Sequence, residues 1–224
     1  MENSIAFQLL YVAHNNQKQK FNIAPTQLHV ALVGAMLLDL FRSDEIKING
    51  DKVICNHQNA VQSKYPELFE KLLKSKKERS IKTWIQRLSM HGNKFMKKSL
   101  QKMHEHQLLK VEFLKFLGFI PYHKTAIVNK GKHASTVKSL KDIVLLNKEA
   151  DELEHWLLTL LAPSKLILNL CKDREERKRM KVKLKNYKVD NRFGDDVHSV
   201  MRDMEAAFVV AIASTAAINA STHH

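Results

Sequence analysis

The stretch PTQLHVALVGAMLLDLFRSDEIKINGDKVICN, residues 25–56, carries the clearest structural signals in the sequence. Pro25 suits the first turn of a helix, where its missing N–H would have no partner in any case. The apolar residues that follow cover most sides of the predicted helix, which indicates that the helix is buried. From Ile46 to Cys55, apolar and polar residues alternate around Asn49-Gly50, a dipeptide that strongly favours a tight β-hairpin. A buried helix followed by a two-stranded hairpin is therefore expected.

Outside this stretch the spacing of the apolar residues is mostly helical. Helices are expected within residues 5–13, 65–77, 81–92, 95–112 and 195–220, and two more within residues 133–171. Pro163 is expected to kink the second of these two, because proline removes a backbone donor and crowds the preceding turn. Gly118 and Pro121 interrupt residues 113–131, where a second hairpin or a wing-like extension is expected. Residues 172–189 predict a charged helix or loop.

The composition predicts one mainly α-helical domain. The chain has 224 residues, of which 44% are hydrophobic, so it can bury a sizeable core. Its 4 Pro and 6 Gly leave few places for a linker, and one compact domain over residues 1–222 is expected, with His223 and His224 as a possible tag remnant. No signal peptide is expected. The most apolar run, from Ala206 to Ala220, is shorter than the ~20 residues that span a bilayer.

The chain is strongly basic, because 37 Lys and Arg stand against 23 Asp and Glu, a formal net charge of +14. This excess favours an anionic partner, either nucleic acid or an anionic membrane surface, although it also fits a charge that only keeps the protein soluble. The strongest concentration of positive charge lies toward the C-terminus. Its members are Lys172, Arg174, Arg177, Lys178, Arg179, Lys181 and Lys183, followed by Lys185 and Lys188.

Two kinds of anionic surface fit this cluster equally well at the level of sequence. Near an anionic bilayer each basic side chain contributes ~1 kcal/mol of binding. The same groups bind the phosphates of DNA or RNA in a salt-dependent manner. A second basic patch has the same alternatives; it comprises Lys71, Lys74, Lys76, Lys77 and Arg79. An ordinary solvated helix face is the third interpretation of both.

No motif in the sequence predicts catalysis, a cofactor or a metal. The glycine-rich patterns of dinucleotide and phosphate-loop sites are absent, as is the nucleophile elbow of hydrolases. His104 and His106 lie two residues apart, so on a helix they point in different directions. The carboxylates of residues 151–154 are expected to stabilise the start of a helix. Cys55 and Cys171 are expected to be free thiols. A binding protein, rather than an enzyme, is expected.

Several segments occur in the order that is typical of a known family. They are ALVGAMLLDLFRSDEIKI with KVIC, then SIKTWIQRLS, LQKMHEHQLLKVE leading into FLGFIPYHKTAIV, LEHWLLTLLAPSKLI and the Ala-rich terminal helix. Over nearly the whole chain this order resembles the Golgi phosphoprotein 3 family, whose eukaryotic members are Golgi adaptors for phosphatidylinositol 4-phosphate. The resemblance implies a mostly helical single domain with a central helical bundle, and a basic face applied to a membrane.

The resemblance also implies a headgroup pocket built from one Trp and three Arg, from which this chain departs. The matching positions hold Ala24, Val33, Glu152 and His155. None of these side chains offers the fork of donors with which arginine binds phosphate. The remaining candidates for contact with a lipid headgroup are His29, His155 and Trp156. Residues 172–181 stand where the family has an apolar membrane-inserting hairpin, so electrostatic attachment is expected instead.

The sequence therefore predicts a cytoplasmic, peripherally attached adaptor that binds an anionic phospholipid membrane and has a possible protein partner. Nucleic-acid binding is one alternative, because the helix from Pro25 and the hairpin after it resemble a winged-helix arrangement. This alternative is weakened by the apolar sequence LHVALVGAMLLDLF, which presents few groups able to read base edges. A non-enzymatic scaffold for protein interactions is the other alternative.

Overall fold

The computed structural model describes residues 4–16, 18–21, 23–56, 63–75, 77–116, 120–162, 166–186 and 206–214. Within these residues the protein is mainly α-helical, as predicted. Its helices are α1 (Ile5–Ala13), α2 (Pro25–Arg42), α3 (Pro66–Leu73), α4 (Ile81–Ser89), α5 (Gly92–Glu105), α6 (Lys130–Leu146), α7 (Glu152–Leu161), the 3₁₀ helix η2 (Leu166–Leu170) and α8 (Arg174–Asn186), followed by a helix at residues 206–214. Its strands are β1 (His14–Asn15), β2 (Lys20–Phe21), β3 (Ile46–Asn49), β4 (Lys52–Cys55), β5 (Arg79–Ser80), β6 (Leu109–Phe116) and β7 (Ile120–Ile127).

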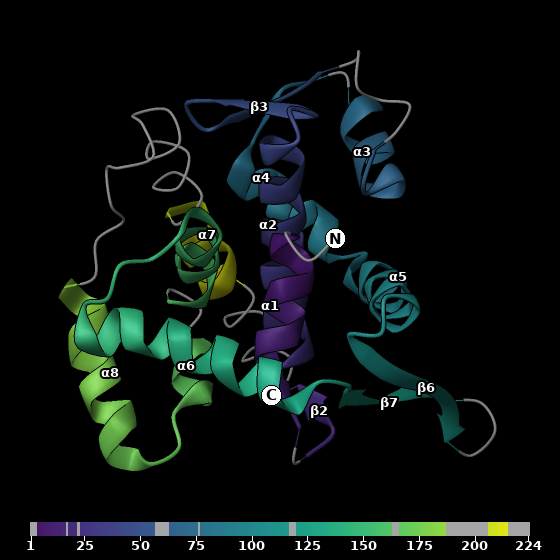
Figure 1. Cartoon of the computed structure of the whole chain (residues 1–224). Helices are drawn as coiled ribbons and strands as arrows, with labels where there is room; N and C mark the ends of the chain where they lie inside the picture. The colour runs from purple at the N-terminus through teal and green to yellow at the C-terminus, as the bar shows by residue number, and fades with distance from the viewer. Residues whose placement is uncertain are drawn as a thin grey trace, which may run out of the picture.

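Helices α1 and α2 lie along each other at the centre of the molecule (Figure 1). The side chains of α2 are buried almost continuously from Val30 to Leu40, which confirms the buried helix predicted from the sequence. Figure 1 shows α3 and α5 on one side of this central pair and α6, α7 and α8 on the other. The apolar sequence of α2 thus provides the core on which the two groups of helices pack.

A buried carboxylate of α2 holds the first turn of α1. The backbone N–H groups of Ile5 and Ala6 donate to the carboxylate of Asp39, at 2.8 Å and 3.1 Å. The hydroxyl groups of Ser4 and Tyr65 donate to the same carboxylate, at 2.7 Å and 2.6 Å. These bonds satisfy donors at a helix N-terminus that have no partner within the helix. They fix where α1 begins relative to α2.

Helix α7 and the helix at residues 206–214 pack on another part of α2. A Cβ atom added to Gly34 would lie 3.2 Å from the side chain of Leu160 and 3.6 Å from that of Phe208. Leu160 and Phe208 are both fully buried. The glycine in the middle of α2 therefore makes room for side chains from two segments that are distant in sequence.

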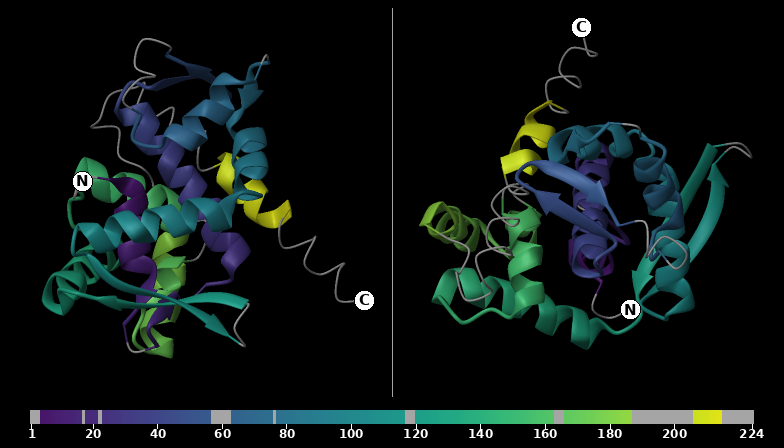
Figure 2. Two further views of the ribbon diagram at one scale, coloured as in Figure 1. Left: turned by 90° about the vertical axis from the view of Figure 1, so that its right-hand side faces the viewer. Right: turned by 90° about the horizontal axis from the view of Figure 1, so that it is seen from above.

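Both predicted hairpins are present, and each is antiparallel. In β3–β4, Asn49 pairs with Lys52, so Gly50 and Asp51 form the loop, and Gly50 has a φ of +56°. This left-handed backbone is the reason that a glycine suits the position. Strand β5 adds to the edge of β4. The longer hairpin β6–β7 projects from one side of the molecule, away from α8, in both Figure 1 and the right-hand view of Figure 2.

Some predicted boundaries differ from the structure. The helix expected within residues 95–112 begins at Gly92 and ends at Glu105, and Leu109 already belongs to β6. Gln107 adopts a φ of +55°, a left-handed conformation that ends the helix. Glycine usually occupies this position, so the sequence gives no signal for this helix end. Residues 14–21, where the sequence predicted no helix or strand, contain the short pair β1–β2. The predicted kink at Pro163 and the final histidines lie outside the described residues.

No helix among the described residues is long and apolar enough to cross a membrane. Of the terminal apolar run from Ala206 to Ala220, the structure describes residues 206–214, which are helical.

Candidate functional site

The C-terminal basic cluster lies on the exposed face of α8. Lys172, Arg174, Arg177, Lys178, Arg179 and Lys181 are exposed, and Lys183 is half-buried. Met180 is fully buried and turns one side of the helix toward the protein. Val182 is 58% exposed, so an apolar side chain stands among the cations. This pattern gives α8 a charged outer face with a small apolar element.

Helix α8 is held in place by a buried ion pair with α6. Lys141 Nζ lies 2.8 Å from Glu176 Oε1, and both side chains are nearly buried. Burial raises the pKa of Glu176, but the Lys141 ammonium and the backbone N–H of Lys172 outweigh it and hold this pKa below its ordinary value. In addition, Arg177 Nε donates to the backbone oxygen of Leu168 at 3.2 Å. These contacts anchor the helix and leave most of its cations facing solvent.

Of the three candidate headgroup residues, two lie in the interior. Trp156 is fully buried, its Nε1 donates to Glu152 Oε1 at 3.1 Å, and its ring meets that of Phe41 edge-on at a centroid distance of 6.1 Å. His155 is also buried. In this structure neither side chain is accessible to a ligand from the surface.

The third candidate, His29, lies at the other end of α2. It is half-buried in the first turns of the helix, and its side chain packs on the backbone of Gly92 at the start of α5. Burial lowers the pKa of His29. Arg42, in the last turn of α2, donates from Nε to Glu152 Oε1 at 3.2 Å. The 13 residues from His29 to Arg42 correspond to ~20 Å of helix, so the structure does not bring His29 together with the start of α7.

The four positions that match the family's pocket do not converge either. Ala24 is exposed and precedes the first turn of α2, whereas Val33 is fully buried in the middle of that helix. Glu152 is held by Arg42 at the far end. A phosphate pocket built from these positions has no support in the geometry of this chain.

The second basic patch instead lines a cavity of about 790 Å³, which we name the α3–α4 cavity. It lies between the end of α3, the strand β5, helix α4 and the turn that leads into α5. Its lining residues are Lys71, Lys74, Ser75, Lys77, Arg79, Trp84, Arg87, Leu88, Met90 and His91. None of these residues is acidic. Four residues of the predicted patch therefore lie around one concavity, and Lys76 lies outside the described residues.

The contacts within the α3–α4 cavity leave part of its positive charge uncompensated. Lys74 pairs with Glu70 on the exposed surface of α3. Arg79 Nε donates to Ser75 Oγ at 3.3 Å, which orients the guanidinium group. Across the described part of the chain, Lys77 and Arg87 form no ion pair. A concave site lined by one sign of charge concentrates positive potential.

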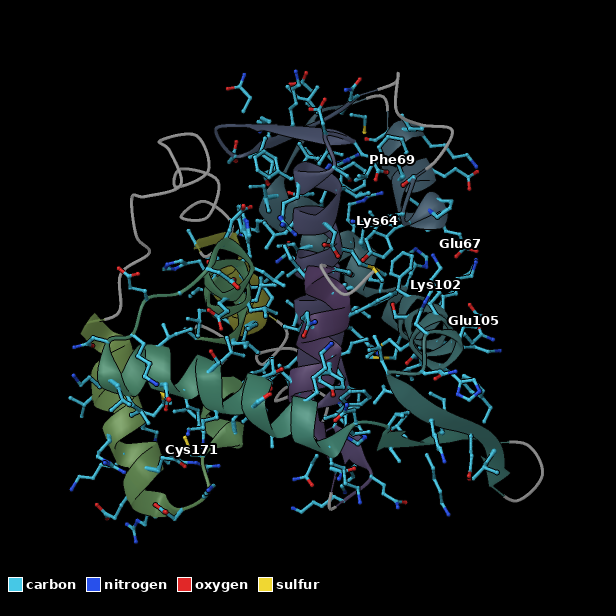
Figure 3. All side chains as sticks on the ribbon, viewed as in Figure 1. Lys64, Glu67, Phe69, Lys102, Glu105 and Cys171 are labelled. Atoms are coloured by element: carbon cyan, nitrogen blue, oxygen red, sulfur yellow. The ribbon has the colours of Figure 1, made fainter. Side chains whose placement is uncertain are left out.

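A neighbouring cavity shows the opposite arrangement. It has a volume of about 170 Å³ and is lined in part by Lys64, Glu67, Lys98 and Lys102, of which Lys64, Glu67 and Lys102 are labelled in Figure 3. Here Glu67 accepts from Lys98 and also lies 3.2 Å from Lys94. The lysine ammonium groups hold the pKa of Glu67 below its ordinary value, chiefly through the bond from Lys98. The lysines of this cavity thus have a carboxylate among them, which the α3–α4 cavity lacks.

Four of the ten residues that line the α3–α4 cavity belong to the basic patch predicted from the sequence. That patch groups the cations of residues 71–79 but not Arg87, Met90 or His91, which come from α4 and the turn after it. Arg87 lies three residues after Trp84 and so shares its side of the helix. This spacing could have indicated that Arg87 lines the cavity, once Trp84 is known to line it.

Metal and thiol chemistry find little support in the described residues. They contain no group of three or more potential ligands that could hold a metal ion. Cys55 and Cys171 are free, as expected. Burial raises the pKa of both thiols, and at Cys171, labelled near α8 in Figure 3, the Glu176 carboxylate adds to this. Raised pKa values disfavour the reactive thiolate form.

Comparison with known proteins adds a family to this geometry. Residues 5–204 match the family model described as Golgi phosphoprotein 3 (GPP34), which covers nearly the whole chain. No curated protein matches the chain.

Proposed function

The chain belongs to the Golgi phosphoprotein 3 family, and from this membership and its basic surface we propose that it is a non-enzymatic peripheral adaptor that attaches to anionic phospholipid membranes. Attachment from the cytoplasmic side and the recruitment of a protein partner are part of this proposal. The family membership suggests a Golgi-associated lipid or protein adaptor role, and the chemistry of the surface favours the lipid side of that role.

One observation carries the proposal: α8 presents five exposed cations, and Lys172 just before it adds a sixth, on a helix that is firmly anchored. Each basic side chain near an anionic bilayer adds ~1 kcal/mol, so a few of them acting together suffice for reversible binding. The exposed Val182 adds an apolar contact at the same place. Because Lys141 and Glu176 hold the helix against α6, the helix loses little conformational entropy when these cations bind a surface.

Nucleic-acid binding through a winged-helix arrangement fits this geometry less well. Helix α2 and the hairpin β3–β4 do follow one another, as that alternative requires. A recognition helix, however, must place its side chains in the major groove to read base edges. The side chains of α2 from Val30 to Leu40 are buried in the protein core, so this helix offers no such face.

The proposal is tested by co-sedimentation with phosphatidylcholine vesicles that contain or lack phosphatidylserine, at low salt. The wild type is expected to sediment with the anionic vesicles only. The triple variant Arg174→Gln, Lys178→Gln, Lys181→Gln removes three exposed charges from one face of α8. At ~1 kcal/mol each, it is expected to bind roughly 150-fold more weakly.

The matched control removes the same net charge elsewhere on the molecule, by Lys20→Gln, Lys110→Gln and Lys124→Gln. These exposed lysines lie on β2, β6 and β7. An equal loss in both triple variants would show that net charge alone drives binding and would reject the role of α8. Equal sedimentation with neutral and anionic vesicles would sink the proposal as a whole. Retention of duplex DNA under the same conditions, without vesicle binding, would favour the nucleic-acid alternative.

A further inference from the structure

The residues that line the α3–α4 cavity include basic side chains and no acidic one. Six of its lining residues carry basic side chains: Lys71, Lys74, Lys77, Arg79, Arg87 and His91. Of these, Lys74 is paired with Glu70. The remaining lysine and arginine side chains, Lys71, Lys77, Arg79 and Arg87, repel one another across a concave surface. An anion that binds between them removes this repulsion, and its negative charge is what the site lacks.

Two of these basic groups lie within hydrogen-bond distance of each other. Lys71 Nζ and His91 Nε2 are 3.2 Å apart. An ammonium group has only donors, so it binds the imidazole nitrogen only when that nitrogen is a neutral acceptor. The Lys71 ammonium has three N–H donors, so it can donate to an anionic oxygen in the cavity while it keeps its bond to His91. His91 thus positions the Lys71 ammonium and leaves it donors for an anion.

The arginines make phosphate the best match among anions. A guanidinium group presents a planar fork of donors that matches phosphate oxygens, and such charge-assisted bonds are about twice as strong as neutral ones. Arg79 is oriented by its bond to Ser75, which leaves its terminal amino groups for a ligand. Arg87 is exposed and approaches from α4 on the other side. A phosphate monoester carries up to two charges and three terminal oxygens, enough for two arginines and the Lys71 ammonium.

The size and rim of the cavity indicate what kind of molecule carries this phosphate. A volume of about 790 Å³ falls in the range of roughly 300–1,000 Å³ that small-molecule sites occupy. Trp84 and Leu88 are buried beneath the charged groups, whereas Met90 on the lining is 85% exposed. An exposed methionine beside a cluster of cations suits the boundary between headgroups and acyl chains, where apolar side chains insert and cations meet phosphates.

We infer that the α3–α4 cavity, lined by Arg79, Arg87 and the Lys71–His91 pair with Met90 at its rim, binds the phosphate-monoester headgroup of a membrane lipid. This inference rests on the proposed attachment to anionic membranes and adds a specific site to it. The site is separate from α8: Figure 1 shows α3 and α8 on opposite sides of the central helices α1 and α2. The two contributions are therefore separable by mutation.

The experiment compares vesicles that differ in headgroup chemistry at matched surface charge. Phosphatidic acid presents a phosphate monoester, whereas phosphatidylserine presents a diester. The wild type is expected to bind phosphatidic acid vesicles more tightly than phosphatidylserine vesicles of the same charge. Arg87→Gln is expected to remove most of this preference by weakening phosphatidic acid binding about tenfold or more, because it deletes hydrogen bonds to a charged group.

Lys82→Gln is the matched control, because Lys82 is an exposed cation of the same helix that does not line the cavity. Lys77→Gln provides a second variant from the α3 side of the cavity. Met90→Ser is expected to weaken binding to phosphatidic acid vesicles while leaving the binding of soluble glycerol 3-phosphate unchanged. All four positions are exposed, so these variants are expected to fold.

The outcomes separate this inference from the proposed function. Binding to phosphatidylserine without a preference for phosphatidic acid overturns the cavity site alone, as does an equal effect of Arg87→Gln and Lys82→Gln. Binding to neither vesicle overturns both proposals. Glycerol 3-phosphate that binds as tightly as phosphatidic acid vesicles, with Met90→Ser without effect, overturns the lipid as the source of the phosphate.

Discussion

Replacing Asp39 with alanine is expected to destabilise the fold by about 4 kcal/mol. The Asp39 side chain is fully buried and accepts from four donors: the N–H groups of Ile5 and Ala6 and the hydroxyls of Ser4 and Tyr65. A buried donor without an acceptor costs about 1–3 kcal/mol. The two hydroxyls lie 3.0 Å apart and bond to each other when the carboxylate is gone, so most of the loss comes from the two N–H groups and the space left behind.

The measurement is urea unfolding followed by circular dichroism, at a pH near neutrality. Tyr65→Phe removes one donor but keeps the ring, and is expected to cost only about 1 kcal/mol. Burial, reinforced by the Asp39 carboxylate, raises the pKa of Tyr65 well above its ordinary value, so the phenol is a donor throughout this range. Asp51→Ala is the control, since Asp51 is exposed in the β3–β4 loop and is expected to change stability by less than about 0.5 kcal/mol.

A cost of Asp39→Ala no greater than that of Asp51→Ala would refute the stabilising role of the Asp39 carboxylate. So would an equal cost of Tyr65→Phe and Asp39→Ala, because the carboxylate would then contribute nothing beyond its bond to this one hydroxyl. A loss of about 4 kcal/mol is a large part of the 5–15 kcal/mol that typically stabilises a domain, so the unfolding of the variant is measured from the lowest urea concentrations upward.

Two further predictions concern the packing of histidines. Burial lowers the pKa of His14 to about 4, outweighing its bond to the backbone of Thr125, so the unfolded chain binds this proton at a higher pH than the folded protein does. The contribution of His14 to the free energy of unfolding is therefore expected to be fully present above pH ~6.5 and to fall by about 3 kcal/mol as the pH drops to about 4. His14→Gln should reduce this pH dependence, which urea unfolding at a series of pH values measures. Gly92→Ala is expected to cost about 2 kcal/mol, because the new Cβ would lie 2.2–2.6 Å from the Cβ and ring atoms of His29. Gly131→Ala in α6 meets only Asn129, at 3.6 Å, and should leave the thermal unfolding temperature nearly unchanged or slightly raised; equal shifts in the two variants would contradict the packing argument.

The elements that the sequence predicted well are those with local signals. Helix α2 begins at Pro25, where the ring fits a first turn, and the β3–β4 loop contains Gly50, which takes a positive φ. The spacing of the apolar residues defined α3 and α4 in the same way. The end of α5 was not predicted because it depends on a left-handed backbone at Gln107, a conformation that glutamine rarely adopts.

The candidate site was predicted only in part, because its residues come from different elements. The cations of α8 lie close together in the sequence, so they could be grouped without knowledge of the fold, whereas their exposure and the burial of Met180 came from the structure. The headgroup candidates His29 and His155 were grouped by analogy, and the structure places them toward opposite ends of α2. Periodicity within a helix says which side is apolar, but it does not say which residues of two helices meet.

By itself, the sequence determined the helical class, the buried character of α2, both hairpins and the sign of the surface charge. These properties follow from local backbone preferences and from side-chain composition. Only the tertiary structure decided that Asp39 closes the start of α1, that Trp156 belongs to the core, and that α3 and α4 enclose a basic cavity with Arg87. Such features depend on how elements distant in the chain approach one another, which is set by the packing of the whole core.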